Sequence, residues 1–365
     1  MEETGRLPLG VGLVGCGRIS ETYVQTLAGS DAVRVVQCAD LDPSRARRIA
    51  AVAGAEWTTT AELLVDERIQ VVLNLTPPAM HAEIALAGLE AGKHVYGEKP
   101  LATDRAAARQ ILEQAASRGL AVGCAPDTFL GPSWQRARTL VDAGAIGEPV
   151  AVRATMLATG PESWHPDPAF FYLRGGGPLL DMGPYYVSAI VALLGPVARV
   201  SALARRTHEV RPVTGGPRVG DLLHVEVATH VAALLELESG AVATLVTSFD
   251  CRDQVHSIEL WGTDGTLLLP DPNGHNGTIQ RRGRDTQAPW ETLDGAPDVY
   301  ARGIGLVEMA EALGHAASPR AGGELAFHVL DVLLAILESA EAGAAVELGS
   351  RCQRPAPLAP EQLAA

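Results

Sequence analysis

Residues 11–20 read VGLVGCGRIS, and this stretch decides the fold of the first part of the chain. An apolar run, a glycine-rich turn and a helical pattern follow one another, as in the dinucleotide-binding fingerprint. Gly15 permits the tight turn, Gly17 lets the backbone approach a pyrophosphate, and Ser20, in the place of the third glycine, still allows close helix packing. The N–H groups at the helix start are predicted to bind the phosphates. The predicted cofactor-binding residues of this turn are Gly15, Gly17, Arg18 and Ile19.

Asp40 ends the second apolar run, twenty residues after Ser20. Its carboxylate is placed to accept hydrogen bonds from the adenosine ribose and to repel a 2′-phosphate, which predicts NAD in preference to NADP. Arg45, Arg47 and Arg48 follow closely and keep NADP open as the alternative. A tight turn followed by a helix-capping aspartate is the interpretation that needs no cofactor.

Apolar runs alternate with helical patterns through the first third of the chain. The runs are Val11–Val14, Val33–Ala39, Val71–Leu75, His94–Tyr96 and Leu120–Gly123. The helical stretches are Glu21–Leu27, Ser44–Val52, Ala61–Val65, His81–Glu90 and Asp104–Ala116. Because the runs are apolar on both faces, they predict buried parallel strands, and the alternation predicts an α/β, doubly wound Rossmann sheet. We therefore assign residues 1–125 to an NAD-binding Rossmann domain.

The pattern changes near Ala125 to longer, β-branched and alternating runs. The expected strands are Val150–Met156, Val197–Ala204, His224–Leu237, Ala241–Thr247 and Ser257–Trp261, and the expected helices include Tyr185–Leu194 and Glu324–Glu341. Such runs separated by turn signals predict a mostly antiparallel, open-faced sheet covered by helices on one face. We assign residues 126–350 to this α+β domain for substrate binding and oligomerisation. We expect residues 211–220 to be a loop and residues 351–365 to be a loosely ordered tail.

Composition narrows the class of protein. A length of 365 residues predicts two domains, and a net charge of −14 disfavours nucleic acid and anionic membranes as partners. The acidic N-terminus has no apolar run, so we expect no signal peptide. The five cysteines are scattered, without CxxC or Cys/His zinc spacing. We therefore expect no metal, reduced thiols and a cytoplasmic location; Cys16 is either a reactive thiol at a helix start or a small residue that fits the turn.

Three further stretches carry a resemblance to a known family. Residues 76–81 read TPPAMH, residues 98–100 read EKP, and residues 175–186 read GGGPLLDMGPYY. With the glycine turn, the LPDPN sequence at 269–273 and the helix near 323–330, they resemble the Gfo/Idh/MocA family of glucose–fructose oxidoreductases, inositol dehydrogenases and rhizopine-catabolism proteins over nearly the whole chain. The resemblance implies an active site between two domains, NAD or NADP as cofactor, and sugars, inositols or related polyols as substrates. It also implies a homodimer or homotetramer formed through the exposed sheet.

The EKP and GGGPLLDMGPYY stretches contain the candidate catalytic residues. Oxidation of a carbinol needs a base for the hydroxyl proton and a positive group near the oxygen. Lys99 follows a strand and suits the second role, although a solvated surface lysine is the simpler alternative. Tyr185 stands where many family members carry a histidine, and Lys99 together with the nicotinamide is expected to lower its pKa; the alternative is a core tyrosine. Asp181 either helps to cap the helix near Pro184, binds a substrate hydroxyl, or holds Tyr185 and Lys99 in place.

The other candidates contact ligand or support the site. Trp164 and His165 suit a sugar, with its apolar face and polar rim, and His165 is the alternative proton carrier; ordinary loop packing is the competing interpretation. His81 lies near the nicotinamide or simply begins a helix. The remaining predicted cofactor-binding residues are Thr76, Pro77, His81, Glu98 and Lys99.

Three functions fit these residues. The first is an NAD-dependent dehydrogenase or reductase for a sugar, glycoside or cyclitol. The second keeps NAD tightly bound and uses transient oxidation of the sugar for elimination or epimerisation. The third is a non-catalytic NAD-binding regulator, which Lys99 and Tyr185 disfavour because a regulator has no need of them.

Overall fold

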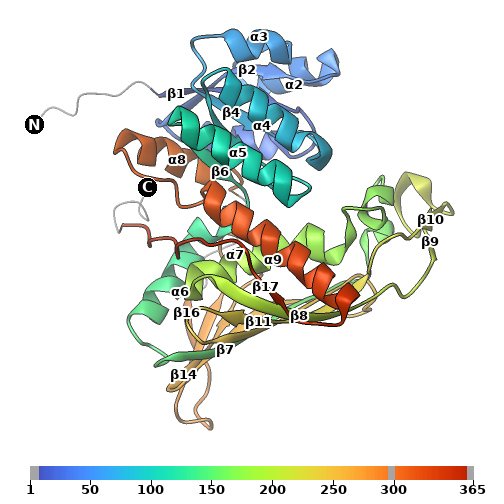
Figure 1. Ribbon diagram of the computed structural model, residues 1–365, viewed down its shortest axis with the longest axis vertical. Helices are drawn as coiled ribbons and strands as arrows, with labels where there is room; N and C mark the ends of the chain where they lie inside the picture. The colour runs from blue at the N-terminus through green and yellow to red at the C-terminus, as the bar shows by residue number, and fades with distance from the viewer. Residues whose placement is uncertain (1–7, 295–300, 360–365) are drawn as a thin grey trace, which may run out of the picture. The chain divides into compact units, whose positions relative to one another are not determined.

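A computed structural model of the chain describes residues 8–294 and 301–359. This part of the chain forms two compact units (Figure 1). The first unit contains residues 8–130 and 301–330, and the second contains residues 131–294 and 331–359. Helix α9 (Gly323–Ala342) belongs to both units, since the division falls within it.

The first unit is built on a six-stranded parallel sheet with the order β3-β2-β1-β4-β5-β6. Its strands are β1 (Leu9–Val14), β2 (Val33–Ala39), β3 (Glu56–Thr58), β4 (Val71–Asn74), β5 (His94–Gly97) and β6 (Val122–Cys124). The order reverses between β1 and β4, so the carboxyl ends of these strands flank the crevice where doubly wound sheets bind ligands. The predicted Rossmann fold is confirmed; the short edge strand β3 was not predicted.

Helices connect these strands at the predicted places. They are α1 (Ser20–Leu27), α2 (Pro43–Ala53), α3 (Thr60–Val65), α4 (His81–Glu90) and α5 (Arg105–Arg118). Side-chain caps explain where they begin: Asp42 accepts a hydrogen bond from the Ser44 N–H at 2.8 Å, and Asp104 accepts one from the Ala107 N–H at 2.9 Å. Helix α5 ends at Gly119, which takes the left-handed conformation with φ 65°.

Residues 301–330 pack with the first unit, although the sequence pattern placed them in the second domain. The buried carboxylate of Asp127 explains this, because its Oδ2 accepts the N–H groups of Gly303 and Gly305, both at 2.9 Å, at the start of α8 (Ile304–Gly314). Leu306 and Met309 of α8 enter the core around β1. A contact between residues some 176 positions apart has no local sequence signal.

A nine-stranded mixed sheet forms the second unit, with the order β16-β15-β14-β13-β7-β12-β11-β8-β17. Its strands are β7 (Pro149–Leu157), β8 (Val197–Arg205), β11 (His230–Leu237), β12 (Val242–Ser248), β13 (Val255–Gly262), β14 (Gly265–Leu269), β15 (Ile279–Gly283), β16 (Glu291–Asp294) and β17 (Val346–Glu347). Among the described strands of this sheet, β7 and β12 pair in parallel and the other pairs are antiparallel. The predicted mostly antiparallel sheet is confirmed.

Helix α7 (Gly177–Leu194) covers one face of this sheet, over β7, β11 and β12 (Figure 1). Side chains on that face, such as Leu235, are buried. The opposite face exposes apolar side chains on neighbouring strands: Leu203, Leu234 and Val242. Helix α7 has the length and composition of a membrane span, but 83% of it is buried within the structure, as in the core helix of a sheet-based unit.

Helix α7 corrects a prediction about Asp181. The sequence placed Pro184 at the helix start and Asp181 near the cap, but the helix begins eight residues before Tyr185, at Gly177–Pro178. Pro178 suits a first turn, because its missing N–H would have no partner there. Pro184 therefore lies inside the helix, and burial of this apolar segment outweighs the lost hydrogen bond.

Three other predictions about the second unit are wrong in part. The run His224–Leu237 is not one strand: β10 (Leu222–His224) pairs with β9 (Val210–Pro212), and β11 begins only at His230. The expected loop 211–220 contains the end of β9 and the turn η5 (Gly216–Arg218). The expected loose tail is hydrogen-bonded to the unpredicted helix α6 (Pro132–Asp142), since Arg138 donates to the Pro355 carbonyl and the Leu358 N–H donates to Gln135. Residues 360–365 of that tail lie outside the described residues.

Candidate active site

The glycine-rich turn of residues 15–20, here named the cofactor loop, is shaped by backbone contacts. Gly15 has φ 97°, and a Cβ atom there would lie 2.6 Å from the carbonyl of Leu75, just after β4. A Cβ on Gly17 would meet no atom within 4 Å, so this side of the loop is open. The Ser20 hydroxyl donates to the Gly17 carbonyl at 2.6 Å and fixes the start of α1. The loop therefore has the open, backbone-lined form that a pyrophosphate requires.

Asp40 lies directly beside this loop. Its Oδ2 accepts the Cys16 N–H at 2.7 Å, and its Oδ1 accepts the Asp42 N–H at 2.8 Å. Each carboxylate oxygen has further lone-pair capacity, so the two bonds orient the group and leave it able to accept ribose hydroxyls.

The three arginines after Asp40 have partners elsewhere on the surface. Arg45 pairs with Asp42 at 3.5 Å, Arg48 pairs with Glu21, and the Arg47 guanidinium lies 4.3 Å above the Trp57 ring. These contacts engage the three arginines with other groups, while the Asp40 carboxylate lies against the cofactor loop through the Cys16 N–H, which favours NAD.

Cys16 is a packing residue of the loop. It is fully buried, and its thiol lies 3.6 Å from the Ala39 carbonyl. A hydrogen bond with Cys38 and burial both raise the pKa of the Cys16 thiol well above its ordinary range. Since the thiolate is the reactive form, the structure favours the small residue that fits the turn over the reactive thiol.

The segments after β4 and β5 are joined by His81. Its buried ring lies between two carbonyls, with Nδ1 2.5 Å from the Pro100 oxygen and Nε2 2.8 Å from the Thr76 oxygen. Asn74, at the end of β4, accepts from the Thr76 N–H and hydroxyl and donates to the His81 carbonyl. His81 therefore begins α4 and also holds the Thr76–Pro77 turn against the segment that contains Lys99 and Pro100. Pro77 in this turn is exposed.

Glu98 is fixed by two hydrogen bonds. The Tyr23 hydroxyl donates to its Oε1 at 2.8 Å, and the Lys99 N–H donates to its Oε2 at 3.1 Å. Burial, followed by the nearby Glu98 carboxylate, raises the pKa of Tyr23 well above its ordinary value, so the phenol remains a donor. Lys99 itself is half-buried at the carboxyl end of β5, the strand next to β4. Sequence reasoning missed Tyr23, whose only signal is a tyrosine one turn into the first helix.

Asp181 and Tyr185 lie in the second unit, both within α7. Residues four apart on a helix share one face, so the carboxylate and the phenol project from neighbouring turns. Tyr185 is 8% exposed, whereas Tyr186, one position round the helix, is fully buried. Burial raises the pKa of Tyr186 well above its ordinary value, which supports its interpretation as a core residue.

Trp164 and His165 lie in residues 159–173 of the second unit, here named the aromatic loop. Trp164 is 61% exposed and Phe170 is 54% exposed. The His165 ring packs edge-on between them, with centroid distances of 5.3 Å to Trp164 and 5.4 Å to Phe170. Its Nδ1 accepts the Asp167 N–H at 3.1 Å, so in a neutral ring the proton is on Nε2. The loop presents two accessible aromatic rings, of which the sequence pattern identified one.

The fold and the cofactor loop define an NAD-binding oxidoreductase, and comparison with protein families agrees. A model described as oxidoreductase family, NAD-binding Rossmann fold, matches residues 9–125, and a GFO/IDH/MocA C-terminal domain model matches residues 134–268. The chain belongs to the Gfo/Idh/MocA family, and its cofactor is NAD. The predicted resemblance is confirmed.

Individual relatives span most of the chain. The D-xylose 1-dehydrogenase (NADP(+)) 2 of Haloferax volcanii is 28% identical over 92% of this chain and 99% of its own length. The dTDP-3,4-didehydro-2,6-dideoxy-alpha-D-glucose 3-reductase of Actinomadura kijaniata is 31% identical over 72% of this chain and 74% of its own. A solved levoglucosan dehydrogenase, in complex with NADH and L-sorbose, has the same fold, with a TM-score of 0.80, 22% identity, and coverage of 94% of this chain and 100% of that one.

Proposed function

We propose that the protein is an NAD-dependent oxidoreductase that transfers a hydride between nicotinamide and a hydroxyl or keto carbon of a sugar, glycoside or cyclitol. The observation that carries the proposal is the place of Lys99. The lysine follows β5, and β5 is separated from the cofactor loop at the end of β1 by one strand, β4. All three strands are parallel, so their carboxyl ends lie at one edge of the sheet, where ligands bind in this fold.

The remaining chemistry is assigned to named side chains. NAD supplies the hydride acceptor when bound. Lys99 stabilises the negative charge that develops on the substrate oxygen, and Glu98, held by Tyr23, fixes the backbone from which Lys99 projects. Tyr185, in its phenolate form, accepts the hydroxyl proton and becomes a neutral phenol, and Asp181, one turn earlier, binds a neighbouring substrate hydroxyl.

The aromatic loop supports a sugar as substrate. Sugars pair an apolar C–H face with polar edges, and Trp164 offers an exposed ring face beside the imidazole of His165. Relatives named for xylose, for a dTDP-linked sugar and for levoglucosan support the same substrate class. In this proposal Trp164 and His165 bind the substrate and do not transfer its proton.

We also propose a homodimer or homotetramer in the cytoplasm. The apolar side chains on the open face of the second sheet support association, because such a face is costly to leave in water. The five cysteines are free thiols, which supports a reducing compartment.

Absorbance of NADH after mixing the protein with NAD and D-xylose, levoglucosan or inositol tests the proposal. Steady NADH formation with at least one compound is the expected result. Product formation without net NADH, with NAD detected by mass analysis of the purified protein, would instead favour elimination or epimerisation with retained NAD. NAD binding without turnover of any compound, in the protein and equally in Lys99→Ala, would favour the regulator.

A further inference from the structure

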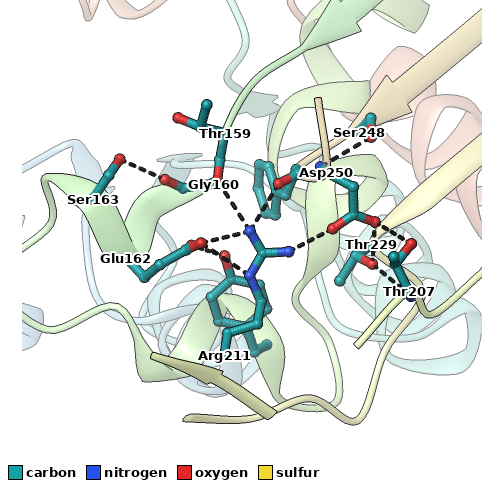
Figure 2. A network of polar contacts seen from close by, with 11 residues as sticks. Thr159, Gly160, Glu162, Ser163, Thr207, Arg211, Thr229, Ser248 and Asp250 are labelled. Carbon is teal, nitrogen blue, oxygen red and sulfur yellow. Dashed lines mark hydrogen bonds and ion pairs between the residues drawn. The ribbon is translucent and has the colours of Figure 1, made fainter. Parts of the chain in front are cut away.

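Arg211 is the centre of a buried polar network in the second unit (Figure 2). It lies in β9, and only 8% of it is exposed. Its Nε donates to Glu162 Oε1 at 2.9 Å, its Nη1 to Asp250 Oδ1 at 2.5 Å, and its Nη2 to the carbonyls of Thr159 and Phe249, both at 3.0 Å. One guanidinium thus joins the beginning of the aromatic loop to the segment that follows β12.

The two carboxylates of the network are also fully engaged. The Tyr172 hydroxyl donates to Glu162, and the hydroxyls of Thr207 and Thr229 donate to Asp250 Oδ2 at 2.7 and 2.6 Å. Burial alone raises the pKa of Asp250, but the hydrogen bonds from the two threonines and the ion pair with Arg211 outweigh it, so this pKa lies below its ordinary value. Asp250 therefore remains a carboxylate at neutral pH.

The network holds the turn from which Trp164 and His165 project. That turn is η3 (Pro161–Ser163), and the N–H groups of Trp164 and His165 donate to the Pro161 carbonyl at 3.1 and 2.8 Å. The Glu162 carbonyl accepts the N–H groups of Thr214 and Gly215, at 3.0 and 3.1 Å. Both sides of Glu162, its side chain and its backbone, are thereby bound to residues 211–215.

Gly160 shows how closely the loop fits around the guanidinium. Its φ is 91°, and a Cβ there would lie 2.4 Å from Glu162 Oε2, 2.5 Å from the Tyr172 hydroxyl and 3.1 Å from Arg211 Nη2. The backbone of the loop thus packs directly on the charged groups, as Figure 2 shows. A second contact closes the far end of the loop, where the Glu226 N–H donates to the Tyr172 carbonyl at 2.8 Å.

We propose that Arg211 is a positioning residue for substrate binding: with Glu162 and Asp250 it fixes the aromatic loop so that Trp164 and His165 are pre-organised for the substrate. A buried ion pair adds little stability compared with a well-packed apolar core, but it imposes one geometry, because a broken pair leaves a charge without its partner. A pre-formed loop spares the substrate the cost of ordering it. This inference rests on the proposed function for its kinetic consequence but not for its structural one.

Hydrogen exchange tests the structural consequence without any substrate. In Arg211→Gln, amides of residues 160–173 should exchange at least ~10-fold faster, while those of α7 and β11 keep their rates. Arg211→Lys keeps a cation and should recover part of the protection. Arg199→Gln is the matched control, since Arg199 pairs with Glu236 on the surface of the same unit, and it should change nothing. Unchanged exchange in Arg211→Gln would overturn the proposal, whatever the enzyme's activity.

Kinetics test the second consequence with the compound that the panel identifies. Arg211→Gln should raise KM by roughly 10-fold and change kcat by less than about 3-fold, since the reacting groups are untouched. The affinity for NAD should stay the same. Should Arg211→Gln fail to fold, Thr207→Val, which removes one donor to Asp250, should show the same KM effect at smaller size. A fall in kcat with unchanged KM would overturn the positioning role. If none of the tested compounds is turned over but the aromatic-loop amides exchange faster in Arg211→Gln, only the proposed function is overturned.

Discussion

The cofactor loop and the aromatic loop both place ligand-binding groups, but they are built from different parts of the chain. The cofactor loop is six residues of backbone, shaped by the φ of Gly15 and held by Asp40, which directly follows the adjacent strand β2. The aromatic loop is held by side chains, with Arg211 as their common partner, some fifty residues further along the chain. The first site can therefore be read from a motif, whereas the second depends on charges that meet only in the folded unit.

Tyr185→Phe should give the largest effect if the second unit supplies the chemistry. Removal of the hydroxyl should lower turnover by roughly 10²- to 10⁴-fold, the range for losing a general base, and abolish the rise of activity with alkaline pH. NAD affinity should hardly change, since the cofactor loop is intact. His165→Asn should mainly raise KM. Steady-state kinetics across pH would contradict this assignment if Tyr185→Phe stayed active and His165→Asn lost turnover.

Lys99→Ala sharpens the comparison, because Lys99 is the proposed catalytic side chain of the first unit. Turnover should fall by about 10²-fold, the scale for one pre-organised electrostatic group, with NAD affinity nearly unchanged. Lys93→Ala is a poor control, since that lysine is buried and donates to two backbone carbonyls. Arg109→Ala is a better control, because Arg109 is an exposed residue on α5 of the same unit, and it should keep the parental turnover. Parental turnover in Lys99→Ala would remove the lysine from the proposed mechanism.

Two glycine variants distinguish the backbone conformation that the cofactor loop requires at Gly15 from the open volume that it leaves beside Gly17. Gly15→Ala should weaken NAD binding by roughly 10-fold or more and lower stability, because a non-glycine residue at such a φ costs ~1–3 kcal/mol and its Cβ would meet the Leu75 carbonyl. Gly17→Ala should weaken NAD binding without loss of stability, since its Cβ meets no protein atom. Calorimetric titration and thermal melts measure both. Equal melting losses in the two variants would refute this distinction.

Asp40→Ala should change cofactor choice more than cofactor affinity. Loss of the carboxylate removes the acceptor for the ribose and the repulsion of a 2′-phosphate, so the preference for NAD over NADP should narrow by about 10-fold. Asp31→Ala, at an exposed position of the same unit, is the control and should keep the preference. The ratio of dissociation constants for NAD and NADP gives the answer. An unchanged ratio in Asp40→Ala would mean that groups other than Asp40 discriminate between NAD and NADP.

The smallest predicted effect is the pH dependence of stability that arises from the contact between His256 and Asp271 in the second unit. The His256 Nδ1 lies 2.8 Å from Asp271, and this hydrogen bond raises the pKa of His256. The stabilisation is complete below the unfolded pKa of about 6.5 and is lost as pH rises through the folded pKa. His256→Gln should therefore lower Tm by roughly 2–4 °C at acidic pH near 5.5 and leave it unchanged at alkaline pH. A loss confined to alkaline pH would contradict this sign.

The sequence predicted those parts of the fold that depend on local periodicity. Buried Val-rich runs and the helical stretches between them identify the strands and helices of the first unit to within a few residues, except for the short strand β3. Local sequence patterns gave the wrong helix boundary where contacts with distant residues determine it. Pro184 suggested a helix start, but α7 continues through it because the helix buries its apolar face. The unpredicted helix α8 is likewise fixed from a distance, by Asp127.

The sequence alone determined the Rossmann fold and the NAD-binding loop with Asp40, because short spacing rules govern glycine turns and strand ends. Lys99 follows one of these strands, whereas Asp181 and Tyr185 were identified through the resemblance of residues 175–186 to the family. Only the tertiary structure decided that Asp181 and Tyr185 share one helix face, that Tyr23 holds Glu98, and that Arg211 lies buried between two carboxylates. Composition marks Arg211 as a polar residue of a Gly/Pro-rich loop. Its partners are 39 and 49 residues away, and pairing at that separation arises from packing of the whole unit, which no local pattern encodes.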